Sequence, residues 1–379
     1  MSGRDPRHPI RVAAWFPPPV RRYPLAFGAS VGIMAPVVVP PEPVTHDADV
    51  GADHALAVPG LPAGLTVRRP AAADAAALVD LCARDEAAVV GHPVTPIGEV
   101  LEMLAPAHTR PDADQWLVLD AAGLPVVWGL ISDAGNTAHQ DVCVFRDGGR
   151  VDEQVRRLVL DRLLARTAER ARERGYQRVE LGAGCFPADQ AYAATLRAAG
   201  FQHGRTFHWM LIDLEPAPPV TVDVPAGVRI APLDPDEEQQ WRDVHAVLQA
   251  SFADHWGSVP VAYQDFRAEV DAEPHADLPL WRLAWLDGHV VGVSRASGRH
   301  QDEGGGWVAQ LGVLPHARGR GIARALLQAS FEANRAAGRT SVGLGVDSEN
   351  STGAVRLYES VGMHLTQQVH AYTRDVLSA

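Results

Sequence analysis

Residues 307–338 read W-V-A-Q-L-G-V-L-P-H-A-R-G-R-G-I-A-R-A-L-L-Q-A-S-F-E-A-N-R-A-A-G, and this stretch decides the fold. Its first part, Trp307 to Leu314, is short and apolar and is followed by a proline, which is typical of a mostly buried strand. From Ile322 the apolar residues recur at helical spacing, and Gly338 is the expected stop. The stretch therefore predicts a strand, a turn and a helix in direct succession.

The turn between these two elements is R-G-R-G-I-A, residues 318–323. Its two glycines allow backbone N–H groups to point outward at the positive end of a helix dipole, where an anion such as phosphate would bind. Glycine-rich turns between strands and helices also occur as plain turns. Taken alone, the turn leaves both interpretations open.

The residues after the helix favour the anion-binding interpretation of the turn. A second short strand is predicted at Ser341 to Val346, Asn350 follows it, and residues 353–362 read G-A-V-R-L-Y-E-S-V-G, a predicted short helix that carries Tyr358. In this order and spacing, R-G-R-G-I-A followed by N-S-T-G-A-V-R-L-Y-E-S-V-G-M resembles the acyl-CoA-binding core of the GNAT N-acetyltransferases. The resemblance is tight over residues 307–363 and loose over the rest of the second half.

Composition excludes several other classes of protein. The 379 residues carry a formal net charge of −12 without a Lys/Arg run, so we expect no nucleic-acid partner. The three cysteines, Cys82, Cys143 and Cys185, are far apart and form neither a disulfide framework nor a paired metal-ligand pattern. No H-E-x-x-H or Cys/His cluster occurs, and we expect no metal site. We expect a cytoplasmic monomer or homodimer without a membrane partner.

Residues 1–62 differ from the rest in being rich in Pro, Ala, Gly and Val without a sustained helical period. We expect a disordered or non-native leader, with Met34 as an alternative start. Arg21 and Arg22 before an apolar run weakly resemble an export signal, but prolines interrupt that run. Residues 28–32, G-A-S-V-G, match the hydrolase pattern around Ser30 but lack its strand-turn-helix context, so a hydrolase is a weak rival.

From Leu65 onward the chain repeats itself. Glycines recur at an offset of 163 or 162 residues, in the pairs Gly64 and Gly227, Gly129 and Gly292, Gly175 and Gly338, and Gly200 and Gly362. Two W-x-x-x-x-G-type segments, residues 116–130 and 281–293, read as hairpins around a glycine turn. The predicted layout is a leader at 1–62, a first domain at 63–215, a proline-rich linker at 216–227 and a second domain at 228–379.

The two repeats differ where chemistry would be located. At an offset of 163, residues 318–323 correspond to 155–160, V-R-R-L-V-L, which contain no glycine, and Tyr358 corresponds to Leu196 at an offset of 162. We therefore expect the first domain to keep the fold and lose the cofactor site. It would serve either as a wall of the acceptor pocket or as a stabilising partner domain.

The resemblance implies an α/β (α+β) fold of two tandem GNAT domains. Each would have a mixed, mostly antiparallel twisted sheet flanked by helices, with a central pair of parallel strands that splay apart to admit acetyl-CoA. The implied cosubstrate-binding residues are Leu311, Gly312, Val313, Arg318, Gly319, Arg320, Gly321, Ile322, Ala323, Arg324 and Asn350. From the residues alone, Gly312 suits a bulge or packs against a helix, the arginines could merely be solvated, and Asn350 could cap a helix.

The resemblance assigns a general acid to this sequence, whereas the base is left open among several candidates. The resemblance implies that Tyr358 is the general acid that protonates the departing thiolate, against the alternative of a core tyrosine with a satisfied hydroxyl. A base is needed because an amine is almost wholly protonated at neutral pH. The first candidates are Asp254 and His255, in a segment that loosely resembles mycothiol synthase, and the alternative is helix capping. Glu303 and Gln310 come second.

These features predict transfer of an acetyl group from acetyl-CoA directly to a primary amine of a small molecule. Within this class the acceptor could be a mycothiol-precursor amine, an antibiotic amine, or a protein lysine or N-terminus. A protein that only binds or senses acyl-CoA is the alternative from another class. Such a protein would need the phosphate-binding turn but not Tyr358.

Overall fold

The computed structural model describes residues 58–95, 97–104, 109–132, 138–216, 221–253, 260–273, 275–349 and 353–377. The expected leader, its Ser30 motif and Met34 lie outside these ranges, apart from residues 58–62.

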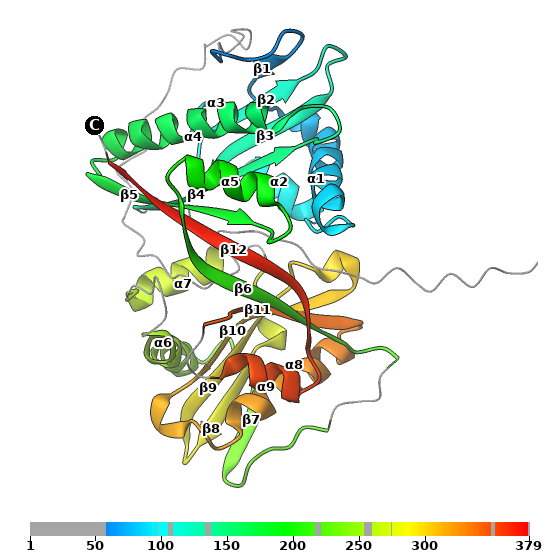
Figure 1. The fold of residues 1–379 in the computed structure, drawn as a ribbon. Helices are drawn as coiled ribbons and strands as arrows, with labels where there is room; N and C mark the ends of the chain where they lie inside the picture. The colour runs from blue at the N-terminus through cyan, green and yellow to red at the C-terminus, as the bar shows by residue number, and fades with distance from the viewer. Residues whose placement is uncertain are drawn as a thin grey trace, which may run out of the picture.

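Apart from the short helix α3 and the 3-10 turns, the two halves contain the same kinds of element in the same order (Figure 1). The N-terminal half consists of β1 (Thr66–Arg68), α1 (Ala75–Val90), α2 (Ile97–Leu104), α3 (Pro111–Asp114), β2 (Gln115–Leu119), β3 (Pro125–Ser132), β4 (His139–Arg146), α4 (Glu153–Glu173), β5 (Arg178–Cys185), α5 (Gln190–Ala198) and β6 (Gln202–Asp213). The C-terminal half consists of β7 (Val228–Pro232), α6 (Glu238–Phe252), α7 (Tyr263–Ala272), β8 (Arg282–Leu286), β9 (His289–Ser297), β10 (Gly305–Val313), α8 (Ile322–Ala336), β11 (Ser341–Asp347), α9 (Ala354–Ser360) and β12 (His364–Leu377). Four short 3-10 turns complete the set, η1 (Ala72–Asp74), η2 (Leu278–Leu280), η3 (Gln301–Glu303) and η4 (Pro315–Ala317).

This confirms the mixed α/β fold and the predicted strands and helices of the deciding stretch. The two predicted hairpins are β2–β3 and β8–β9. The repeated glycines at 129 and 292 have a packing reason, because a helix lies directly on each. A Cβ on Gly129 would lie 2.3 Å from Cγ1 of Val159 in α4, and one on Gly292 would lie 2.9 Å from Cδ1 of Leu326 in α8.

All twelve strands form one sheet, in the order β1-β2-β3-β4-β5-β12-β6-β11-β10-β9-β8-β7. Among the described strands, β4–β5 and β10–β11 pair in parallel and the other neighbours pair antiparallel. The two halves are therefore joined edge to edge through β12 and β6, the long strands that cross the centre of Figure 1.

The last strand of each half lies in the sheet of the other half. β6, which precedes the linker, pairs with β11, and β12, at the end of the chain, pairs with β5. The cores follow this exchange: Met210 of β6 packs in a cluster of the C-terminal half, and Tyr372 of β12 packs in the main core of the N-terminal half. The predicted boundaries 63–215 and 228–379 divide the chain in sequence, whereas β6 and β12 cross them in space.

Candidate functional site

The central parallel strands of the C-terminal half form a fork. β10 and β11 pair only from Gly305 and Ser341 to Trp307 and Gly343, although both strands continue beyond that point. β11 remains paired with β6 up to Asp347, and β10 remains paired with β9 up to Val313. Beyond Trp307, the facing edges of β10 and β11 thus pair with no strand of the described residues, which leaves a place where an extended ligand can pair with the backbone.

Val313 presents its backbone N–H to this fork. The N–H of the next residue, Leu314, donates to the carbonyl of Val291 in β9 at 2.9 Å. Successive N–H groups along a strand point to opposite edges, so the N–H groups of Val313 and Leu311 point away from β9 and toward the fork. This geometry agrees with the role expected for the Val313 N–H.

Gly312 is not the site of the bulge. The register between β10 and β9 shifts between Val308 and Gln310, whereas Gly312 pairs regularly with Val293. A Cβ on Gly312 would lie 3.0 Å from both Cβ and Oγ of Ser251, at the end of α6. The glycine is needed because α6 packs closely against β10, which the sequence offered as the alternative interpretation.

The turn before α8 has the backbone of an anion site. Gly319 has φ +74° and Gly321, the N-cap of α8, has φ +80°, which are conformations that favour glycine. The first hydrogen bond of this 15-residue helix runs from the Ala325 N–H to the Gly321 carbonyl. The N–H groups of the three preceding residues, Ile322 to Arg324, have no partner within the helix and point along its positive end.

The three arginines of the turn have different roles. Arg318 donates to the carbonyls of Val313 and Ser251 at 3.1 and 3.2 Å, which ties the turn to β10 and α6. Arg324 donates to the carbonyl and hydroxyl of Ser360 at 3.2 and 2.8 Å, which ties α8 to α9. Arg320 is exposed and makes no hydrogen bond or ion pair with any described residue, so its charge is available to a phosphate.

Tyr358 packs in the core cluster beneath the fork, with 8% of its surface exposed. Burial raises the pKa of its phenol to about 12, so the group keeps its proton at neutral pH. The hydroxyl makes no hydrogen bond with any described residue, which argues against a core tyrosine with a satisfied hydroxyl. The sequence could assign this residue only by resemblance, because it follows β11 by eleven residues and no local spacing shows where its side chain lies.

The predicted base candidates are less well defined. Asp254, His255 and Asn350 lie outside the described residues. Glu303 ends η3, just before β10, and is exposed. Gln310 is buried on β10 and accepts a 2.7 Å hydrogen bond from Arg295 of β9, a pairing that the sequence did not predict because it joins different strands. Since an amide is not a base at neutral pH, Gln310 can orient a substrate but cannot take its proton.

The N-terminal half lacks the anion site for a different reason from the one expected. α4 begins 169 residues before α8 but ends 163 residues before it, so a constant offset fails in the turn. The corresponding turn is 147–152, D-G-G-R-V-D, and it does contain glycines, neither of which adopts a positive φ. Asp152 caps α4 by accepting from the Gln154 N–H at 3.0 Å, so a carboxylate of the chain occupies the anion position.

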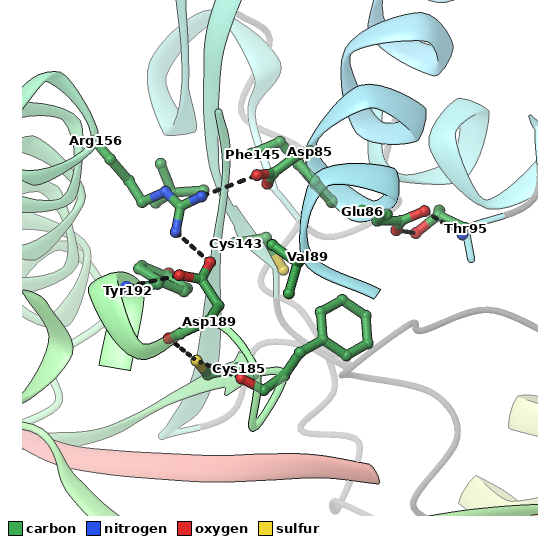
Figure 2. A pocket seen from close by; sticks show the side chains of 13 residues that line it. Asp85, Glu86, Val89, Thr95, Cys143, Phe145, Arg156, Cys185, Asp189 and Tyr192 are labelled. Atoms are coloured by element: carbon green, nitrogen blue, oxygen red, sulfur yellow. Dashed lines mark hydrogen bonds and ion pairs between the residues drawn. The ribbon is translucent and has the colours of Figure 1, made fainter. Parts of the chain in front are cut away.

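The fork of the N-terminal half is lined by a cluster of charged side chains. Pairing of β4 with β5 ends at Val142 and Ala183, and a cavity of about 80 Å³ lies beyond. Figure 2 shows Arg156 bridging two carboxylates there, Asp189 at 2.7 Å and Asp85 at 3.0 Å. Only 1% of Arg156 is exposed, and burial raises the pKa of Asp85 to about 6. A buried ion-pair cluster thus lines the fork of the N-terminal half.

Within the described ranges, no group of three or more His, Cys, Asp or Glu side chains is arranged to hold a metal ion. No helix in the described part of the chain combines the length and apolar character that crossing a membrane would require.

Comparisons with known proteins match this chain mainly in its C-terminal half. Residues 241–363 match the Acetyltransferase (GNAT) family. A mycothiol acetyltransferase of Thermobispora bispora is 35% identical over 176 residues, which are 45% of this chain and 58% of that protein. The chain thus matches less than two thirds of the length of that relative.

Solved structures show the same fold over both halves. A GCN5-related N-acetyltransferase from Sphaerobacter thermophilus superposes with a TM-score of 0.73 at 23% identity, covering 84% of this chain and 97% of that one. A tandem GNAT protein from the clavulanic acid biosynthesis pathway gives a TM-score of 0.59 at 18% identity, covering 82% of this chain and 98% of that one. Residues 241–363 are thus similar to the GNAT acetyltransferase family, and the fold of both halves is similar to that of these solved structures.

Proposed function

We propose that the protein transfers the acetyl group of acetyl-CoA directly to a primary amine of a small molecule, and that the chemistry takes place in the C-terminal half. The observation that carries the proposal is the fork between β10 and β11, which leads to the anion-binding turn of α8 and has Tyr358 packed beneath it. In the N-terminal half, a carboxylate of the chain caps the turn, and a buried ion pair lines the fork. One donor site per chain follows from this difference.

Different residues of the site would bind different parts of acetyl-CoA. The N–H groups of residues 322–324 and the exposed Arg320 hold the diphosphate of acetyl-CoA, because they combine unpaired donors with positive charge. The free edge of β10 pairs with the pantetheine arm. The Val313 N–H donates to the thioester carbonyl and stabilises the negative charge that develops on its oxygen.

Transfer then requires two proton movements. The amine nitrogen attacks the thioester carbon, the C–S bond breaks, and the bond pair leaves on sulfur. Tyr358 donates its phenolic proton to that sulfur, and solvent returns a proton to the tyrosinate. The nitrogen gives up one proton to a base, for which Asp254, His255 and Glu303 remain the candidates.

For the acceptor, the matched relatives named mycothiol acetyltransferase favour an amine of a thiol-pathway precursor. The experiment is to incubate the purified chain with acetyl-CoA and a panel of amines that includes amino sugars, cysteinyl amines and lysine peptides, while measuring free thiol. Thiol release that depends on an amine is the expected result. Tight CoA binding without release for any amine would contradict the transferase and favour a sensor of acyl-CoA.

A further inference from the structure

Gln310, on β10, is a largely buried amide whose orientation is fixed by a neighbouring strand. Its exposed fraction is 6%. It lies directly opposite Arg295 of β9, and its Oε1 accepts a 2.7 Å hydrogen bond from Nη1 of that arginine. Because a guanidinium group can only donate, it selects Oε1 as its partner and not Nε2. Nε2 is therefore the end of the amide that faces away from Arg295.

Arg295 is itself held in place, so the orientation of the amide does not depend on one hydrogen bond. Its Nη2 donates to Glu273, at the end of α7, at 2.8 Å, and its guanidinium lies 4.8 Å from the ring centroid of Trp281. Only 5% of Arg295 is exposed. A buried arginine with a carboxylate partner and an aromatic neighbour has little freedom to rotate.

The other end of the amide, Nε2, is a free donor. It makes no hydrogen bond with any described residue. Nε of Arg295 is fully buried without a hydrogen-bond partner, whereas Nε2 of Gln310 is not closed off from solvent in this way. A donor that is fixed in orientation, lacks a partner in the described part of the chain and is reached by solvent is available to a ligand.

Gln310 lies within the fork, between its closed end and the position proposed for the thioester. It is three residues from Trp307, where pairing with β11 ends, and three from Val313, or about 10 Å from each along the strand. Since Oε1 faces β9, Nε2 is directed toward the opposite edge of β10, which borders the fork. Acetyl-CoA would enter from the turn of α8, so the space beside Gln310 is left for the acceptor.

The side chain of Gln310 is on the side of the sheet opposite α8. Ser294 of β9 hydrogen bonds with Ser330 of α8 at 2.8 Å, so the next residue, Arg295, faces the other way. Gln310 is its cross-strand partner and shares that face. A Cβ on Gly312, two residues further along β10, would meet the end of α6. An acceptor that approaches the thioester on the α6 side of the sheet therefore passes Gln310.

The charges near Gln310 favour a neutral ligand group. Arg295 is paired with Glu273, and Glu269 of α7 also lies within electrostatic range of it. One cation among two carboxyl groups gives no net positive charge, so the local field does not attract a carboxylate. A hydroxyl group would accept from Nε2, but its own proton would need an acceptor that Nε2 does not supply. A neutral carbonyl oxygen meets both conditions.

We propose that Nε2 of Gln310 donates a hydrogen bond to a neutral carbonyl oxygen of the acceptor, and that the acceptor is an amine whose molecule also carries an amide group. The proposal rests on the proposed transferase function and narrows its substrate class. The amine nitrogen does not contact Gln310, so it can be neutral when it attacks the thioester. The distance of about 10 Å between Gln310 and Val313 along the strand, less the reach of the glutamine side chain, places the carbonyl a few bonds from the amine.

Gln310→Glu removes the donor with little change of shape. One carboxylate oxygen can still accept from Arg295, and the other replaces the N–H₂ group by an atom that cannot donate. For an amine that carries an amide, such as 4-aminobutanamide, we expect kcat/KM to fall about tenfold or more, because two acceptors then face each other. For pentylamine, which lacks the carbonyl, kcat/KM should change by less than about twofold.

The ratio of these two constants is the measured quantity, because a new carboxylate that affected proton removal would act on both amines alike. Equal losses for amide-bearing and carbonyl-free amines would overturn the proposal. Gln154→Glu, the same substitution at an exposed residue of α4, is the matched control and should leave both constants unchanged.

A second test does not need turnover. With the protein saturated with CoA, the side-chain N–H₂ signals of Gln310 can be followed by NMR in ¹⁵N-labelled protein, and Gln310→Glu identifies them. 4-Aminobutanamide and butanamide should shift these signals, because both carry the carbonyl, and pentylamine should not. The proposal is overturned if neither amide shifts them.

The outcomes distinguish the two proposals. If the amides shift the Gln310 signals but no amine is acetylated, the carbonyl subsite stands and the transferase proposal fails. If amines are acetylated and Gln310→Glu does not change the preference for an amide, the transferase stands and the subsite is wrong. A rise in the KM of acetyl-CoA in Gln310→Glu, with that preference unchanged, would show that Nε2 holds the pantetheine arm instead.

Discussion

A single position, Gly321, tests whether the turn before α8 holds a diphosphate. The corresponding position of the N-terminal half is the N-cap Asp152, whose carboxylate accepts from the Gln154 N–H in the first turn of α4. Gly321→Asp introduces a carboxylate at the N-cap of α8, and Gly321→Asn places a neutral side chain of nearly the same shape there. The pair of variants therefore separates the effect of charge from that of bulk.

The magnitudes follow from the local geometry. Gly321 has φ +80°, and any Cβ would lie 3.4 Å from Cγ of Pro225, so both variants lose about 1–2 kcal/mol of stability from the left-handed backbone. Asn and Asp cap helices about equally well, and that contribution cancels in the comparison. A carboxylate about 4 Å from one phosphate charge costs about 1 kcal/mol in water and about 4 kcal/mol near a protein surface. Gly321→Asp should therefore bind CoA roughly fivefold to a thousandfold more weakly than Gly321→Asn.

The assay is calorimetric titration with CoA, and urea unfolding checks that the two variants are equally stable. Pantetheine, which carries no diphosphate, should bind both variants and the wild type alike. Equal CoA affinity for Gly321→Asp and Gly321→Asn would refute the reasoning, because no anion could then lie at the N-terminus of α8. A loss of pantetheine binding in both variants would instead show that the substitutions distort the fork.

Four other changes test the remaining parts of the site and the fold. Tyr358→Phe should lower kcat by about 10²–10⁴-fold while leaving the affinity for acetyl-CoA nearly unchanged, and an unchanged kcat would remove the phenol from the mechanism. Separate Asp254→Asn and His255→Gln variants should show which residue titrates as the base, through the loss of the acidic limb of the pH–rate profile; if both retain that limb, the base is elsewhere. Glu99→Gln, which removes a buried carboxyl group of α2, should change the pH dependence of stability: the folded pKa of about 8 exceeds the ordinary value of 4.5, so the folded chain keeps a proton that the unfolded chain releases. The free energy of unfolding of the wild type should therefore fall relative to the variant by about 1 kcal/mol per unit between pH 5 and 8, as urea titrations would measure, and parallel curves would contradict the burial of Glu99. Finally, residues 221–379 expressed alone lack β6 and should unfold at a lower temperature than the whole chain, because one edge of β11 is then unpaired; equal thermal stability would speak against a stabilising role for the exchanged strand.

The local elements of the C-terminal half could be predicted from the sequence because their signals are local. The apolar run before Pro315, the helical period from Ile322 and the stop at Gly338 each depend on neighbouring residues, and all agree with β10 and α8. The glycine repeat also has a local cause, since Gly129 and Gly292 are required where a helix lies on the sheet. Close packing of a helix on a strand can therefore be predicted from the sequence, because it requires a glycine at one particular position.

Features that depend on pairing over long distances could not be predicted in this way. Alternating apolar residues show that β6 and β12 are strands, but they do not show which sheet each strand joins, because either edge would bury the same faces. The constant offset misplaced the turn of the N-terminal half, since α4 is six residues longer than α8 at its start. The burial of Glu99 could not be predicted from the sequence, because a glutamate on a short helix is normally exposed.

The strand exchange gives the N-terminal half a structural part in the proposed donor site. β6 completes the sheet next to β11, and among the described strands it is the one that stays paired with β11 along the fork. Trp209 of β6 contacts Trp307 at the point where β10 and β11 separate, with ring centroids 5.8 Å apart. The opening of the fork is thus set by a strand encoded before the linker. A substitution in β6 would therefore alter acetyl-CoA binding without touching the ligand, whereas a change in the ion pair of Arg156 would act on the N-terminal core alone.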